Sequence, residues 1–206
     1  MHNVMQRWLL GLVRLVVGAR GRYASTPPSA QQTIYYANHS SHVDTLAILA
    51  ALPVDLRSGV RPVAARDYWD ATPTRRFIAN RVLRVVYVNR QGTASDDDPL
   101  RLVRTALTAG WSIIIFPEGT RSLDGEIGPF KSGLFWLSRE FPEARLVPVY
   151  LSNLMRAMPK GKLVPVPLNC DVSFGDPVPG ATGLDKDVFI AQARGALVNL
   201  QDSVRG

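Results

Sequence analysis

From residue 33 onward, short apolar runs alternate with segments of helical pattern, and this alternation limits the possible folds more than any other feature. Three runs are typical of buried strands: residues 33–37, residues 111–116 with three consecutive isoleucines, and residues 145–151. Helical segments stand between them, such as the one from Asp98-Pro99 to Gly110, where Asp suits a helix cap and Pro the first turn. Strands that alternate with helices predict an α/β domain with a central mixed, largely parallel sheet flanked by helices.

The remaining elements and the domain limits follow from the same patterns. We expect further strands at residues 61–65, 85–88 and 170–174, and helices at residues 43–52, 73–83, 132–141 and 185–201. A chain of 206 residues is long enough for one domain with a substantial core and short for two. We therefore predict a single domain over residues 1–206, with an N-terminal helical segment (1–24), a core that carries the motifs described below (33–152), and a closing strand and helix (153–206).

Residues 3–20 have the pattern of an amphipathic helix with a wide apolar face. Asn3, Arg7, Gly11, Arg14 and Gly18 fall on one narrow face, and apolar residues fill the rest. Such a helix either lies in the membrane interface, with its arginines at headgroup level, or packs against its own domain. No apolar run reaches the roughly 18 residues that a spanning helix needs, so we expect a peripheral or monotopic membrane attachment.

Charge and cysteine content narrow the choice of partners and of compartment. The net charge of +7, from 24 Lys and Arg against 17 Asp and Glu, favours an anionic partner: nucleic acid, an anionic membrane or a phosphorylated substrate. The arginines are spread along the chain without an aromatic-interleaved patch, which argues against nucleic acid. The single cysteine, Cys170, cannot form an internal disulfide, so we expect a reducing compartment and the cytoplasmic face of a membrane.

The first segment with catalytic potential is Asn38-His39-Ser40-Ser41-His42-Val43-Asp44, which links a predicted strand to a predicted helix. Histidine can act as a general base near neutral pH, and a carboxylate partner fixes its tautomer and stabilises the imidazolium. His39 in the loop and Asp44 in the first helical turn can meet, whereas His42 would point along the helix and suits the role less well. Ser41 and Asp44 also match a capping box, so Asp44 alternatively serves only to start the helix.

The second segment is Phe116-Pro117-Glu118-Gly119-Thr120-Arg121-Ser122, directly after the isoleucine strand. In open α/β sheets, ligands bind at the carboxyl ends of the strands. Glu118 offers an acceptor, Gly119 a close backbone approach and Arg121 a fork of donors for a phosphate. Taken alone, the segment is also compatible with a plain turn after a core strand. The acidic run at residues 96–98 is explained by a helix cap and solvated charge, so we expect no metal site.

Together, the two segments resemble the glycerolipid acyltransferase family, typified by the 1-acylglycerol-3-phosphate acyltransferases. Three further blocks are similar to that family: Val88-Asn89-Arg90, Phe130-Lys131-Ser132-Gly133 and Val147-Pro148-Val149. The resemblance covers about residues 33–152. The family often carries a lysine after the strand at residues 61–65, where this chain has Arg66, and we leave Arg66 out of the expected site because an arginine keeps the charge but not the geometry.

The resemblance implies a membrane-associated O-acyltransferase that moves a fatty acyl group from acyl-CoA or acyl-carrier protein to the hydroxyl of a lysophospholipid. The favoured acceptor is 1-acylglycerol-3-phosphate, with glycerol-3-phosphate or another lysolipid as alternatives, and no cofactor is implied. His39 would take the proton from the acceptor hydroxyl and Asp44 would orient His39. A thioesterase or lipid hydrolase that uses the same pair is the rival, although the sequence lacks a Gly-x-Ser-x-Gly motif. The acceptor site would be formed by Arg90, Glu118, Gly119, Thr120 and Arg121.

Overall fold

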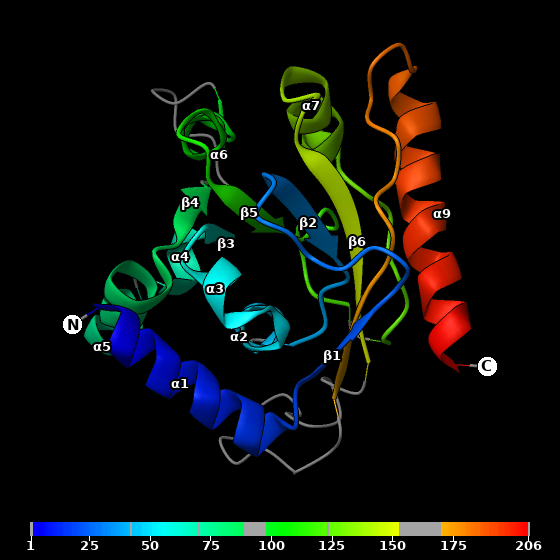
Figure 1. The fold of residues 1–206 in the computed structure, drawn as a ribbon. Helices are drawn as coiled ribbons and strands as arrows, with labels where there is room; N and C mark the ends of the chain where they lie inside the picture. Colours follow the sequence, from blue (N-terminus) through cyan, green and yellow to red (C-terminus); the bar gives the residue numbers. More distant parts are fainter. Residues whose placement is uncertain are drawn as a thin grey trace.

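The computed structural model describes residues 2–41, 43–69, 71–88, 98–122, 124–152 and 170–205. Their central element is a seven-stranded sheet with the order β1-β7-β6-β2-β5-β3-β4 (Figure 1). All neighbouring strands run parallel except β6 and β7, which are antiparallel. This confirms the predicted α/β fold with a mixed, largely parallel sheet. The strands are β1 (Arg20–Tyr23), β2 (Thr33–Ala37), β3 (Val60–Ala65), β4 (Val86–Val88), β5 (Ser112–Ile115), β6 (Arg145–Leu151) and β7 (Asp171–Phe174).

Helices cover both faces of the sheet, with α1 and α2 on one side and α7 and α9 on the other (Figure 1). Side chains of β2 alternate between the two cores: Tyr35 belongs to the core that contains α2, while Ile34 and Tyr36 belong to the core that contains α7. The helices are α1 (His2–Val17), α2 (Asp44–Ala51), α3 (Val54–Arg57), α4 (Arg66–Trp69), α5 (Pro73–Phe77), the π-helix η1 (Ile78–Leu83), α6 (Arg101–Thr108), α7 (Gly133–Glu140) and α9 (Lys186–Arg205).

Helix α1 has one packed face and one exposed face. Leu10 and Val13 are buried in the core cluster that also contains residues of α2 and η1. Trp8 and Leu12, on the other face, are 78% and 58% exposed. Helix α1 therefore packs on its own domain through one face and leaves apolar side chains exposed on the other. Within the residues that the structure describes, no helix combines the length and the apolar character that crossing a membrane requires.

Several boundaries differ from the sequence-based prediction. Strand β1 was not expected, because its four residues carry no strand pattern and are held by parallel pairing with β7. The helix predicted over residues 73–83 is divided into α5 and η1, and it ends at Arg84 in the left-handed conformation with φ 53°. Helix α6 begins at Arg101 rather than at Asp98, whose carboxylate instead accepts a hydrogen bond from the Leu100 N–H.

The sheet register brings the two motif segments together. In the parallel pair β2–β5, Tyr36 lies opposite Ile115. Continuing that register past both strand ends places His39 beside Glu118, three residues further along each chain segment. Because the carboxyl ends of parallel strands meet at one edge, the loops after β2 and β5 share that edge of the sheet.

Candidate active site

His39 and Asp44 are in direct contact at the junction of β2 and α2. The Nδ1 atom of His39 lies 2.8 Å from Oδ2 of Asp44, whose side chain is fully buried. The same oxygen accepts the backbone N–H groups of Ser40 at 2.7 Å and Ser41 at 2.8 Å. Within the described residues, Oδ1 of Asp44 has no hydrogen-bond partner. One carboxylate oxygen therefore fixes both the imidazole and the backbone that precedes the helix.

The alternative role of Asp44, as part of a capping box with Ser41, explains some of these contacts. The bond from the Ser41 N–H to the Asp44 carboxylate is one half of a capping box. The other half is missing, since the Ser41 hydroxyl accepts from the Val43 N–H at 3.4 Å and helix α2 begins after Val43 without a side-chain cap. The contact with His39 lies outside any capping motif, so the structure is compatible with both roles at once.

The loop after β5 holds the backbone of His39 from two sides. Glu118 accepts the His39 N–H through Oε1 at 2.9 Å and the Gly128 N–H through Oε2 at 3.0 Å. The Ser122 N–H donates to the carbonyl oxygen of His39 at 2.7 Å. Burial raises the pKa of the Glu118 carboxyl, against the opposing effect of these two N–H donors. Glu118 therefore joins the backbone of His39 to that of Gly128.

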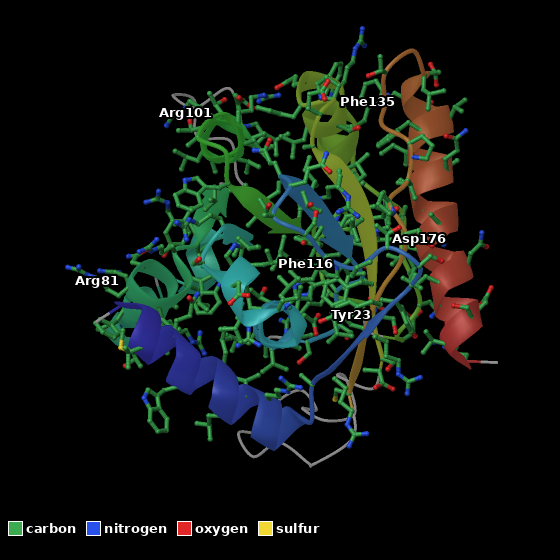
Figure 2. The ribbon with its side chains drawn as sticks, viewed as in Figure 1. Tyr23, Arg81, Arg101, Phe116, Phe135 and Asp176 are labelled. Atoms are coloured by element: carbon green, nitrogen blue, oxygen red, sulfur yellow. The ribbon has the colours of Figure 1, made fainter. Side chains whose placement is uncertain are left out.

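Two further contacts fix the histidine and its motif. The imidazole of His39 stacks on the ring of Phe116, with centroids 4.3 Å apart and an interplanar angle of 20°. Phe116 is labelled in Figure 2 and lies near the middle of the fold, where β5 ends. The side-chain amide of the buried Asn38 donates to the Leu151 carbonyl at 3.1 Å and accepts the Leu151 N–H at 2.8 Å, which ties the end of β2 to the end of β6.

A cavity of about 620 Å³ opens beside this arrangement. His39, Gly119, Arg121 and Lys131 contribute to its wall. A large part of the remaining wall is apolar and comes from β3, α4, β4 and α7. These apolar residues include Val63, Ala65, Trp69, Val88, Leu134 and Trp136. With Arg104, the wall of the cavity thus combines a histidine, three cations and an apolar surface.

The other residues predicted for the site fall into three groups. Gly119 and Arg121 line the cavity with His39, as a substrate pocket would require. Glu118 and Thr120 are not among its lining residues, and Glu118 is nearly buried at 6% exposure. Arg90 lies outside the described residues, as does His42.

Lys131 was not predicted as a site residue, although it lies in one of the blocks that resemble the family. Its backbone N–H donates to the Pro117 carbonyl at 2.8 Å, which pairs its segment with the turn after β5. Its side chain covers Gly119, which has φ +71°, and a Cβ at Gly119 would lie 2.8 Å from both Cε and Nζ of Lys131. The sequence signal was present in the Phe130-Lys131-Ser132-Gly133 block, but nothing in it relates Lys131 to Gly119.

The chain is similar to known acyltransferases. Residues 20–152 match the sequence model of the family described as Acyltransferase. The chloroplastic 1-acyl-sn-glycerol-3-phosphate acyltransferase BAT2 of Brassica napus is 29% identical over 141 residues, which make up 66% of this chain and 37% of that protein. The human 1-acyl-sn-glycerol-3-phosphate acyltransferase alpha is 28% identical over 162 residues, 78% of this chain and 54% of that protein. The chain therefore spans between about a third and about half of the length of these relatives.

A solved structure has the same fold. The crystal structure of the 1-acyl-sn-glycerophosphate acyltransferase PlsC from Thermotoga maritima superposes with a TM-score of 0.76. The alignment covers 97% of this chain and 78% of that chain, at 19% sequence identity. At this identity the likeness concerns the fold, and it includes the region outside residues 20–152.

Proposed function

Because the chain belongs to the Acyltransferase family, we propose that it transfers a fatty acyl group from an acyl thioester to the hydroxyl of a lysophospholipid. The relatives described above carry the name 1-acyl-sn-glycerol-3-phosphate acyltransferase, which is our ground for proposing that compound as the acceptor and phosphatidate as the product. The single observation that supports the chemistry most strongly is the contact of His39, on the cavity wall, with the buried carboxylate of Asp44.

In the proposed mechanism His39 is the general base. With Nδ1–H donating to Asp44, the other ring nitrogen, Nε2, is the one that takes the proton of the acceptor hydroxyl. The hydroxyl oxygen attacks the thioester carbonyl, the C–O bond forms and the C–S bond breaks. The thiolate then leaves as the thiol with the proton from Nε2, which returns His39 to its starting state. The carboxylate of Asp44 stabilises the imidazolium while it carries that proton.

The cavity wall has groups that could bind the acyl chain and the phosphate of such substrates. Its apolar portion, formed by residues such as Val63 and Leu134, would contact an acyl chain, and Arg121 would bind a phosphate through a planar fork of donors. Glu118 would act through His39, whose backbone it holds. We keep Arg90 as a proposed phosphate ligand on the resemblance alone. The donor is proposed as acyl-CoA or acyl-carrier protein, since both present the same thioester.

We also propose that the N-terminal segment attaches the protein to the cytoplasmic face of a membrane. The outer face of α1 exposes Val4, Trp8 and Leu12. On the side of the molecule where α1 begins, Arg81 points outward (Figure 2), and exposed basic and apolar side chains together favour an anionic lipid surface. The cytoplasmic side is proposed because the one cysteine is a free, buried thiol.

The test is transfer by the purified protein. Labelled acyl-CoA and acyl-carrier protein are each offered with lysophosphatidate, glycerol-3-phosphate and a neutral lysolipid, and the products are identified by lipid mass. We expect phosphatidate with lysophosphatidate, and none from a His39→Ala variant run beside it. Release of free fatty acid at the same rate with and without any acceptor would instead identify a thioesterase.

A further inference from the structure

The cationic side chains on the cavity wall differ in whether an acid neutralises them. Among the described lining residues these cations are Arg104, Arg121 and Lys131. Arg104 is held by two carboxylates, since it bonds Asp98 and also donates to Oε1 of Glu140 at 2.9 Å. Lys131 has no such partner: in the part of the chain that the structure describes, no carboxylate lies within ion-pair distance of its ammonium. The wall therefore presents at least one uncompensated positive charge to the cavity.

The position of this charge is set by the fold. The hydrogen bond from the Lys131 N–H to the Pro117 carbonyl fixes the start of the side chain. The far end of the side chain, Cε and Nζ, lies directly over Gly119, in a space that any side chain at position 119 would fill. The ammonium group is thus held against the turn that also carries Arg121, and both residues face the cavity that His39 lines.

We propose that Lys131 is a substrate-binding residue that holds, together with Arg121, a phosphate group of the substrate. A compact ammonium with three donors complements the planar fork of an arginine, and the pair matches the charge of a phosphate monoester. This assignment rests on the proposed transferase function for its substrates. Both substrates carry phosphate, the acceptor on its glycerol and the donor on its CoA or phosphopantetheine arm, so the chemistry is shared and the source has to be measured.

The first test measures binding without turnover. Inorganic phosphate is titrated into the wild-type protein and followed by ³¹P NMR, beside Lys131→Met, which keeps the length and removes the charge. The matched control is Lys186→Met, because Lys186 is an exposed lysine of α9 outside the cavity lining. We expect the dissociation constant for phosphate to rise about tenfold in Lys131→Met and to stay unchanged in the control. Equal phosphate binding by wild type and Lys131→Met would overturn the assignment.

The second test identifies which phosphate is held. If it belongs to the acceptor, Lys131→Met raises the KM for lysophosphatidate about tenfold to a hundredfold and leaves the KM for monoacylglycerol unchanged. If it belongs to the donor, the KM rises for acyl-CoA but not for a phosphate-free acyl thioester of N-acetylcysteamine. Lys131→Arg should recover part of either loss. Losses that are equal with and without the phosphate would refute the role of Lys131. A wild-type protein that binds phosphate but transfers no acyl group would refute the proposed function instead.

Discussion

Replacing Asp44 by Asn separates the two roles that the structure gives to this side chain. The oxygen of an Asn side chain can still accept the N–H groups of Ser40 and Ser41, so the loop before α2 keeps its anchor. The amide NH₂ then occupies the buried position of Oδ1, where the described residues offer no acceptor. The substitution therefore removes the negative charge next to His39 and adds one unsatisfied buried donor.

The magnitude of each effect follows from this geometry. A unit charge about 4 Å from an imidazolium contributes about 4 kcal/mol at an effective dielectric constant of about 20, which corresponds to about a thousandfold in rate. The unsatisfied donor costs about 1–3 kcal/mol of folding stability, or a fall in Tm of roughly 2–12 °C for a chain of this size. We therefore expect kcat to fall about a thousandfold, with the KM values of both substrates within about threefold of wild type.

The assay is initial-rate acyl transfer at 25 °C, far below the expected Tm. Asp187→Asn, on the exposed surface of α9, is the control for loss of a carboxylate. Hydrogen exchange at the Ser40 and Ser41 amides reports whether the anchor remains. If Asp44→Asn keeps more than a tenth of the wild-type rate with both amides protected, Asp44 serves only to anchor the loop, and the inference of a catalytic pair is wrong.

Further substitutions test the remaining parts of the site and the surface. His39→Ala should lower kcat by about a thousandfold or more with an unchanged circular dichroism spectrum, and a variant that keeps over a tenth of the rate means that another group is the base. Glu118→Gln should lower kcat about tenfold to a hundredfold, because an amide leaves one of the two bound N–H groups facing a donor, and an unchanged kcat would show that other contacts hold the loop. Arg121→Ala should raise the KM for a phosphorylated acceptor about tenfold to a hundredfold, with partial recovery in Arg121→Lys, while a selective rise in the donor KM would place the donor phosphates there. Changing both Trp8 and Leu12 to Glu should release the protein from sedimenting anionic vesicles at an unchanged Tm, and retention on the vesicles at moderate salt would locate the membrane contact elsewhere.

The sequence predicted the parts of the fold that have strong local patterns. Residues 33–37 form β2 within the expected limits, and β5 lies inside the expected apolar run. Closing helix α9 extends past the expected residues 185–201 to Arg205. Strand β1 could not be found in this way, because its residues are mostly exposed and the strand that pairs with it, β7, lies far away in the sequence, with Arg20 opposite Asp171.

The contact between His39 and Asp44 could be predicted from the sequence, but the positions of Glu118 and Lys131 could not. Spacing and residue type suggested that His39 and Asp44 could meet, and the structure places them 2.8 Å apart. The hydrogen bond from the His39 N–H to Glu118 depends on the register of β2 against β5, and this register cannot be read from either segment alone. The position of the Lys131 side chain depends on how its segment folds over the turn that contains Gly119. For that reason, the sequence block that contains Lys131 gave no specific prediction.

The strand order also determines when the sheet can be completed during synthesis. Strand β1 pairs only with β7, at the edge of the sheet, and β7 in turn pairs with β6. While the ribosome makes the chain from β6 to β7, at about 5–20 residues per second, the edge of β6 has no neighbour for roughly one to a few seconds. Open edges of this kind pair with other chains, so the edge of β6 is a site of aggregation in the nascent protein during this interval. Strand β1, although it is synthesised before all the other strands, can pair only after β7 has been made.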